Sequence, residues 1–121
     1  MKKTVIIGAT TNSGRYAYLA ASMLKDHGHQ IVPVGIKKGE IFNEQILNIR
    51  QKPDIQNVDT VTMYIGPDHQ PEYYDYIAGL KPKRVIFNPG TENQEFEQLL
   101  ESQGIEVEEA CTLVLLRTAQ Y

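Results

Sequence analysis

Several residue types are scarce in this chain of 121 residues, and each scarcity excludes a class of protein. The single cysteine, Cys111, excludes an internal disulfide framework and a cysteine-rich metal site. No apolar run is long enough to cross a membrane. Residues 1–3, Met-Lys-Lys, lead into a predicted strand without the apolar region of a signal peptide. We therefore expect a cytoplasmic protein with no membrane partner.

An excess of positive charge is also missing. The chain has 12 Lys and Arg against 15 Asp and Glu, which gives a net charge of −3. Nucleic-acid-binding domains usually carry a basic surface, so a nucleic-acid partner is not expected. The hydrophobic content of 41% is typical of an ordinary globular protein. The length predicts one domain, residues 1–121, with one core.

Strand-like and helix-like patterns alternate along the chain. Short β-branched or apolar runs predict five strands, at residues 4–7, 31–34, 58–65, 84–87 and 105–107. Amphipathic stretches predict helices at residues 16–28, 70–80, 92–103 and 110–118. The last of these is ambiguous between strand and helix, and its alanine and leucine content favours a helix. Stretch 40–57 is less regular, and its apolar spacing predicts a short helix limited by Pro53.

This alternation predicts the fold class. The first strand is apolar at every position, which is typical of a parallel sheet covered on both faces. We predict an α/β, Rossmann-like single domain with an about five-stranded parallel sheet, flanked by helices on both faces. Ligands of such sheets bind beyond the carboxyl ends of the strands. Four segments should meet there, namely residues 8–15, 35–38, 64–67 and 88–91.

The first of these segments has the pattern of an anion-binding turn. A buried strand ends at a glycine, small polar residues follow, and a helix then begins with Asn12 or Ser13 as its predicted N-cap. The free N–H groups and the dipole of a helix start attract phosphate. The predicted phosphate-binding residues are Gly8, Ala9, Thr10, Thr11, Asn12, Ser13 and Arg15.

The same turn departs from the dinucleotide fingerprint G-x-G-x-x-G. Gly8 matches its first glycine, but Thr10 and Ser13 occupy the other two glycine positions. The middle glycine normally lets the backbone approach a pyrophosphate closely, so its replacement weakens an NAD interpretation.

The residues after the second strand indicate which nucleotide would fit. NAD sites place an acidic residue there, whereas residues 34–38 read Val-Gly-Ile-Lys-Lys. Lys37 and Lys38 favour an extra phosphate on the ribose, either the 2′-phosphate of NADP or the 3′-phosphate of coenzyme A. A solvated loop is the alternative for either lysine.

The chain also resembles a known family. Residues 8–17, 32–34 and 58–61 look like those of small stand-alone CoA-binding domain proteins. The more specific matches are Phe-Asn-Pro-Gly-Thr-Glu-Asn at 87–93 and Glu-Ala-Cys-Thr-Leu at 109–113. The resemblance covers nearly the whole chain. The family is similar to the N-terminal, CoA-binding domain of the succinyl-CoA synthetase alpha subunit.

The resemblance implies that the cofactor is coenzyme A or an acyl-CoA, laid across the ends of the strands. It implies phosphate binding by residues 8–13 and Arg15. It places Gly35, Ile36 and Lys37 along the adenosine 3′-phosphate. It implies that the pantetheine path is lined by Tyr64, Ile65, Asn88, Pro89 and Gly90. Many relatives read Val-Asn-Pro where this chain has Val-Gly-Ile at 34–36.

Candidate catalytic residues are few. His27 and His29 flank a predicted helix end, and His69 follows the third strand. Cys111 is either a thiol near the reactive end of CoA or a small buried apolar residue. Glu92, Glu108 and Glu109 form either a carboxylate cluster or solvated ends of elements. No nucleophile–base pair and no metal-ligand spacing is recognisable, so no catalytic or metal residue is predicted.

Three functions remain open at this point. The first and favoured one is a non-catalytic module that binds CoA or an acyl-CoA as a sensor or carrier. The second is a small NADP-dependent oxidoreductase, which the lack of a substrate domain in 121 residues disfavours. The third is the CoA-binding subunit of a larger ligase or transferase. A homodimer is expected from the frequency of such assemblies.

Overall fold

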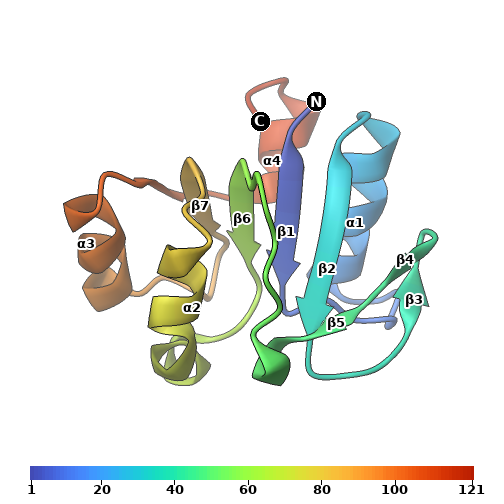
Figure 1. Cartoon of the computed structure of the whole chain (residues 1–121). Helices are drawn as coiled ribbons and strands as arrows, with labels where there is room; N and C mark the ends of the chain where they lie inside the picture. The colour runs from blue at the N-terminus through green and yellow to red at the C-terminus, as the bar shows by residue number, and fades with distance from the viewer.

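The computed structural model describes all residues from Met1 to Tyr121. Its centre is a six-stranded sheet in which every neighbouring pair is parallel, in the order β5-β2-β1-β6-β7-β8 (Figure 1). The strands are β1 (Lys3–Ile7), β2 (Gln30–Gly35), β5 (Leu47–Asn48), β6 (Thr60–Met63), β7 (Arg84–Phe87) and β8 (Glu106–Glu109). The predicted class, an α/β Rossmann-like fold, is confirmed, and the sheet has one strand more than the expected five.

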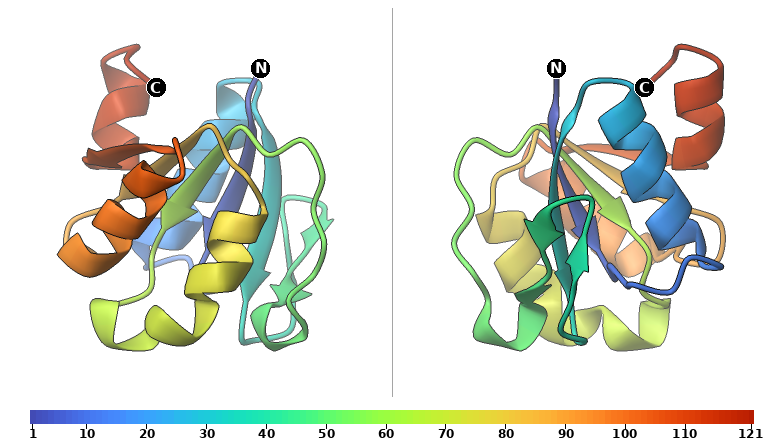
Figure 2. Two further views of the ribbon diagram at one scale, coloured as in Figure 1. Left: turned by 60° about the vertical axis from the view of Figure 1, so that its left-hand side comes forward. Right: turned by 90° about the vertical axis from the view of Figure 1, so that its right-hand side faces the viewer.

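Helices cover both faces of the sheet, as predicted. They are α1 (Tyr16–Asp26), α2 (Tyr74–Gly79), α3 (Gln94–Ser102) and α4 (Thr112–Arg117). Helices α1 and α4 lie on one face and α2 and α3 on the other (Figure 2). The ambiguous stretch 110–118 is therefore helical at its centre. None of the helices is both long and apolar enough to cross a lipid bilayer.

The stretch 40–57 differs from its prediction. Instead of a short helix it forms a hairpin of β3 (Glu40–Ile41) and β4 (Glu44–Gln45), then β5 and the 3₁₀ turn η1 (Ile49–Gln51). Phe42 and Asn43 form the hairpin turn with φ values of 48° and 67°. The predicted helix was wrong because Phe42 contacts Tyr18 of α1, with ring centroids 5.0 Å apart, whereas Ile49 packs in the core of the opposite layer.

Successive side chains of β1 point to opposite faces of the sheet, so the core consists of two hydrophobic layers, one on each face. Val5 and Ile7 of β1 belong to the cluster that contains Ile77 of α2 and Phe96 of α3. Ile6 belongs to the cluster beneath α1 and α4. All three strand residues are fully buried. Full burial of one central strand on both faces explains why its sequence shows no polar alternation.

The connections reverse direction at β1. From this central strand the chain moves to β2 on one side and later to β6 on the other (Figure 1). Because adjacent connections leave on opposite faces, a crevice opens at the carboxyl ends of β1 and its neighbours. Two 3₁₀ turns, η2 (Pro67–His69) and η3 (Pro71–Tyr73), also lie at this edge, before α2.

Candidate functional site

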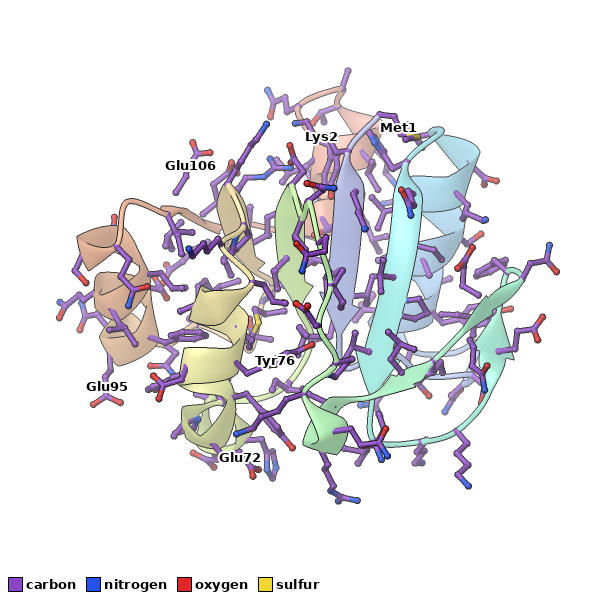
Figure 3. The ribbon with its side chains drawn as sticks, viewed as in Figure 1. Met1, Lys2, Glu72, Tyr76, Glu95 and Glu106 are labelled. Atoms are coloured by element: carbon purple, nitrogen blue, oxygen red, sulfur yellow. The ribbon has the colours of Figure 1, made fainter.

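A cavity of about 660 Å³ opens at the carboxyl edge of the sheet. It brings together the loops that follow β1, β2, β6 and β7, together with η1 after β5. Most of the residues predicted for the site line it, namely Gly8, Ala9, Thr10, Asn12, Arg15, Gly35, Ile36, Lys37, Tyr64, Ile65, Pro89 and Gly90. In Figure 3, the labelled Glu72, another lining residue, lies at the edge where the strand arrows end, far from Met1 and Lys2. The four predicted segments therefore meet in one place.

Backbone contacts hold the loop after β1 between its two neighbouring strands. The N–H groups of Gly8 and Ala9 both donate to the carbonyl of Val34, at 2.9 and 3.0 Å. Gly8 has a φ of 99°, and a Cβ atom there would lie 2.9 Å from the carbonyl oxygen of Tyr64. Only glycine combines this φ with so close an approach to a neighbouring backbone.

Further along the same loop, unpaired N–H groups gather at the start of α1. The N–H groups of Thr10, Thr11 and Ser13, and those of Tyr16 and Ala17 in the first turn, have no acceptor within the protein. Such groups together with the helix dipole are an anion-binding arrangement. Thr10, Tyr16 and Ala17 also line the cavity.

The predicted N-cap of this helix was wrong. Arg15, not Asn12 or Ser13, is the N-cap residue, and no side chain caps the helix. The Asn12 side-chain oxygen instead accepts from the N–H of Gly14 at 3.0 Å. This Asx-type contact satisfies the N–H of Gly14 within the loop, so the N–H groups in the first turn of α1 keep no side-chain partner.

Three predicted site residues, Thr11, Ser13 and Asn88, are not among the residues that line the cavity. Thr11 packs towards Gly39, where an added Cβ atom would lie only 2.4 Å from the Thr11 methyl group. Ser13 is exposed on the outside of the loop.

The side chain of Asn88 is occupied inside the protein. Its amide donates to Thr62 Oγ1 at 2.7 Å and to the carbonyl of Met63 at 2.8 Å, and its oxygen accepts from the N–H of Thr112 at 2.9 Å. The residue is 2% exposed. Asn88 therefore fixes the ends of β6, β7 and α4 relative to one another.

The positive charges of the cavity lie on one half of it. Arg15, Lys37 and Arg50 line it from the loops after β1 and β2 and from η1 after β5. Lys38, the other candidate lysine, does not line it. The half formed by the β6 and β7 loops has no lysine or arginine and carries the carboxylate of Glu72.

Sequence reasoning missed several residues that line the cavity. They are Tyr16, Ala17, Ile49, Arg50, Glu72 and Tyr73. Gly66 and Thr91, which also line the cavity, lie in the segments that were predicted to meet there, and His69 was named only as a candidate catalytic residue. Arg50 was missed because its segment was predicted to be helical, so that β5 and its carboxyl end went unrecognised. The hairpin turn at Phe42-Asn43 contains no glycine, so the sequence offered no clear signal for it.

Two large apolar side chains at the cavity are unusually exposed. Tyr16 is 70% exposed and Ile36 60% exposed, and both line the half that contains the positive charges. Exposed apolar surface beside polar groups is typical of a ligand site. These side chains offer flat contact area at the cavity rim.

Tyr64 lines the cavity but directs its hydroxyl into the protein. The Tyr64 oxygen is buried and has no hydrogen-bond partner. The nearby Thr62 and Thr112 hydroxyls bond to each other at 2.8 Å. Burial disfavours the phenolate and raises the pKa of Tyr64 to about 12. Tyr64 is therefore a neutral wall residue at physiological pH.

The other catalytic candidates do not form one site. Nδ1 of His27 donates to the carbonyl of Met23 at 2.8 Å at the end of α1, and Nδ1 of His29 accepts from the N–H of Lys2 at 2.9 Å. Cys111 is half-buried, precedes α4 and does not line the cavity. His69 is the only candidate histidine that lines it.

The three candidate glutamates have separate structural contacts. Glu92 accepts from the N–H of Gly90 at 2.8 Å, and Glu108 pairs with Arg84 at 3.4 Å. Glu109 interacts with Glu97 on α3. No group of three His, Cys, Asp or Glu side chains is placed to hold a metal ion.

A reversing parallel sheet with a polar cavity at its carboxyl edge defines a ligand-binding protein of the Rossmann-like class. Residues 2–117 match the model of the CoA binding domain family. The chain therefore belongs to the CoA-binding domain family.

Solved structures share the fold of this chain. An uncharacterized protein of known crystal structure is 56% identical, with a TM-score of 0.97, and the match covers 100% of this chain and 98% of that one. A Thermus thermophilus protein, cell-free ID.343, is 21% identical with a TM-score of 0.83 over 99% and 90% of the two chains. A hypothetical protein from Pyrococcus horikoshii OT3 is 21% identical with a TM-score of 0.84 over 97% and 82%. The last two show the shared fold alone. No curated protein matches the chain significantly.

Proposed function

We propose that the protein binds coenzyme A or an acyl-CoA reversibly in this cavity, as a non-catalytic sensor or carrier module. The unequal division of charge within the cavity carries the proposal. Unpaired N–H groups and the three cations Arg15, Lys37 and Arg50 gather around the ends of β1, β2 and β5. Glu72 stands on the opposite half, where it would repel phosphate.

Coenzyme A has the same division. Its phosphorylated adenosine and pyrophosphate carry the negative charge, and its pantetheine arm is neutral. The nucleotide therefore fits the β1–β2–β5 half, with its base against the exposed side chains of Tyr16 and Ile36. The arm then extends across β1 towards the loops after β6 and β7.

Two further observations support binding without chemistry. No serine or cysteine lines the cavity, and His69 is its only imidazole. The family to which the chain belongs is defined by CoA binding. Free coenzyme A and acyl-CoA share the nucleotide and the arm. A difference between the affinities for CoA and acetyl-CoA therefore measures the contribution of the acyl group.

Calorimetric titration tests the proposal. CoA, acetyl-CoA, dephospho-CoA, NADP and NAD are titrated into the wild type and into Arg15→Ala, Lys37→Ala and Lys38→Ala. We expect CoA to bind with micromolar-class affinity, about 8 kcal/mol. Arg15→Ala should weaken CoA and dephospho-CoA alike, by about tenfold, because it removes a charge-assisted contact common to both.

The two lysine variants form a matched pair. Lys37→Ala should abolish the preference for CoA over dephospho-CoA, whereas Lys38→Ala should retain it because Lys38 does not line the cavity. Tighter binding of NADP than of CoA would favour an oxidoreductase instead. A wild-type protein that binds none of these compounds would contradict the proposal.

A further inference from the structure

A single buried side chain joins the loops after β6 and β7, which form the half of the cavity without lysine or arginine. Gln70 lies between η2 and η3 and is fully buried. Its amide nitrogen donates to the carbonyl of Ile65 at 3.0 Å and to the carbonyl of Thr91 at 2.8 Å. Its oxygen accepts from the side-chain amide of Asn93 at 2.9 Å. Every polar atom of the side chain is therefore used.

The two carbonyls belong to loops that the sheet itself does not join. Pairing of β6 with β7 ends at Met63 and Phe87, so no ladder hydrogen bond links the chain beyond these residues. Ile65 and Thr91 lie past that point, and both line the cavity. Gln70 supplies the missing cross-link, because one NH₂ group can satisfy two carbonyls at once.

The cross-link extends to the helix behind the second loop. Asn93, which donates to Gln70, accepts from the N–H of Phe96 at 3.1 Å and is the N-cap of α3. The same Asn93 amide also donates to the Tyr74 hydroxyl at 2.8 Å. A network that fully satisfies a buried side chain and extends to half-buried partners holds its members in one arrangement.

We propose that Gln70 is a positioning residue that sets the spacing between the loops after β6 and β7, and thereby the affinity for the pantetheine arm. The inference rests on the proposed function and deepens it. It assigns recognition of the two parts of CoA to separate halves of the cavity. The nucleotide half, formed by the loops after β1, β2 and β5, makes no hydrogen bond with Gln70.

Gln70→Met tests this, since methionine has nearly the same length and volume but no donor for the two carbonyls. The matched control is Gln98→Met, in which the same change is made at an exposed position of α3. Both variants and the wild type are titrated with CoA and with adenosine 3′,5′-bisphosphate, which lacks the arm. Thermal unfolding of each variant establishes the temperature at which all are folded.

We expect Gln70→Met to bind CoA about tenfold more weakly and to bind adenosine 3′,5′-bisphosphate within about twofold of the wild type. Gln98→Met should match the wild type for both compounds. Amide hydrogen exchange should accelerate in segments 64–67 and 89–92 of Gln70→Met and stay unchanged in segment 8–15.

A second variant, Gln70→Glu, adds a pH signature. Its ionised carboxylate faces two carbonyl oxygens and repels them, whereas its protonated form can donate one hydrogen bond. The CoA affinity of this variant relative to the wild type should therefore recover as the pH falls.

Equal loss of affinity for both compounds, or no loss for either, would overturn the role of Gln70. Failure of the wild type to bind CoA would instead contradict the proposed function itself, and the inference with it. The wild-type titration and the comparison of the variants thus separate the two failures.

Discussion

Replacing Asn88 by alanine should cost far more stability than the same change in an exposed loop. The substitution removes the donor to the Met63 carbonyl, the donor to Thr62 Oγ1 and the acceptor for the Thr112 N–H, at 2.8, 2.7 and 2.9 Å. Each buried hydrogen bond contributes about 1 kcal/mol, so the loss should be about 3 kcal/mol. That is a large part of the stability of about 5–15 kcal/mol typical of a domain.

Urea denaturation followed by circular dichroism measures this loss, and the slope of the transition should match that of the wild type. Asn12→Ala is the control, because its side chain accepts one bond in an exposed loop. It should cost less than about 1 kcal/mol. An Asn88→Ala variant within about 1 kcal/mol of the wild type would show that water replaces the lost partners, and would refute the structural role of this amide.

Two further predictions concern the ionisable side chains of Tyr64 and Glu97. Tyr64→Phe should leave the protein unchanged or stabilise it by about 1 kcal/mol in urea denaturation, because the hydroxyl it removes is buried without a partner; a marked loss would mean that the hydroxyl is bonded. Partial burial, together with repulsion from Glu109, raises the pKa of Glu97 above its usual 4.5. The folded protein therefore holds this proton more tightly than the unfolded chain, and the free energy of unfolding falls as the pH rises above 4.5. Glu97→Gln should therefore melt at a higher temperature than the wild type at neutral pH, and the difference should shrink as the pH falls and Glu97 becomes protonated; equal melting curves at neutral pH would contradict this.

The helices and strands could be predicted from the sequence where the residues of an element themselves show a recognisable pattern. The run at β1 is apolar because both faces are buried, and α1 ends at Asp26, two residues before Gly28, the predicted stop signal, which has a φ of 81°. The hairpin before β5 could not be recognised in this way. Phe42 and Asn43 both adopt the left-handed conformation there, which is uncommon for phenylalanine. Its contact with Tyr18 is a tertiary interaction that local spacing does not reveal.

The candidate site was predictable to the extent that it follows from topology. Segments at the carboxyl ends of parallel strands must share an edge, so most predicted residues do line the cavity. Individual side-chain directions were not predictable. Asn88 belongs to one of the stretches on which the family resemblance rested, yet its amide points inward to Met63 and Thr112. Gln70 gave no signal at all, because a buried glutamine is recognised only through its partners.

A second glycine at the site, Gly35, is required by the backbone of the loop after β1. The loop after β1 approaches its neighbour so closely that a Cβ atom on Gly35 would lie 2.5 Å from the carbonyl oxygen of Ala9. A glycine is therefore required at the end of β2, where the backbone packs directly against the loop after β1. The anion-binding loop and the loop that bears Lys37 thus form one rigid unit, held at Val34 by two hydrogen bonds. Positive charge placed on so rigid a base needs little rearrangement to bind phosphate, which is the physical advantage of preorganisation.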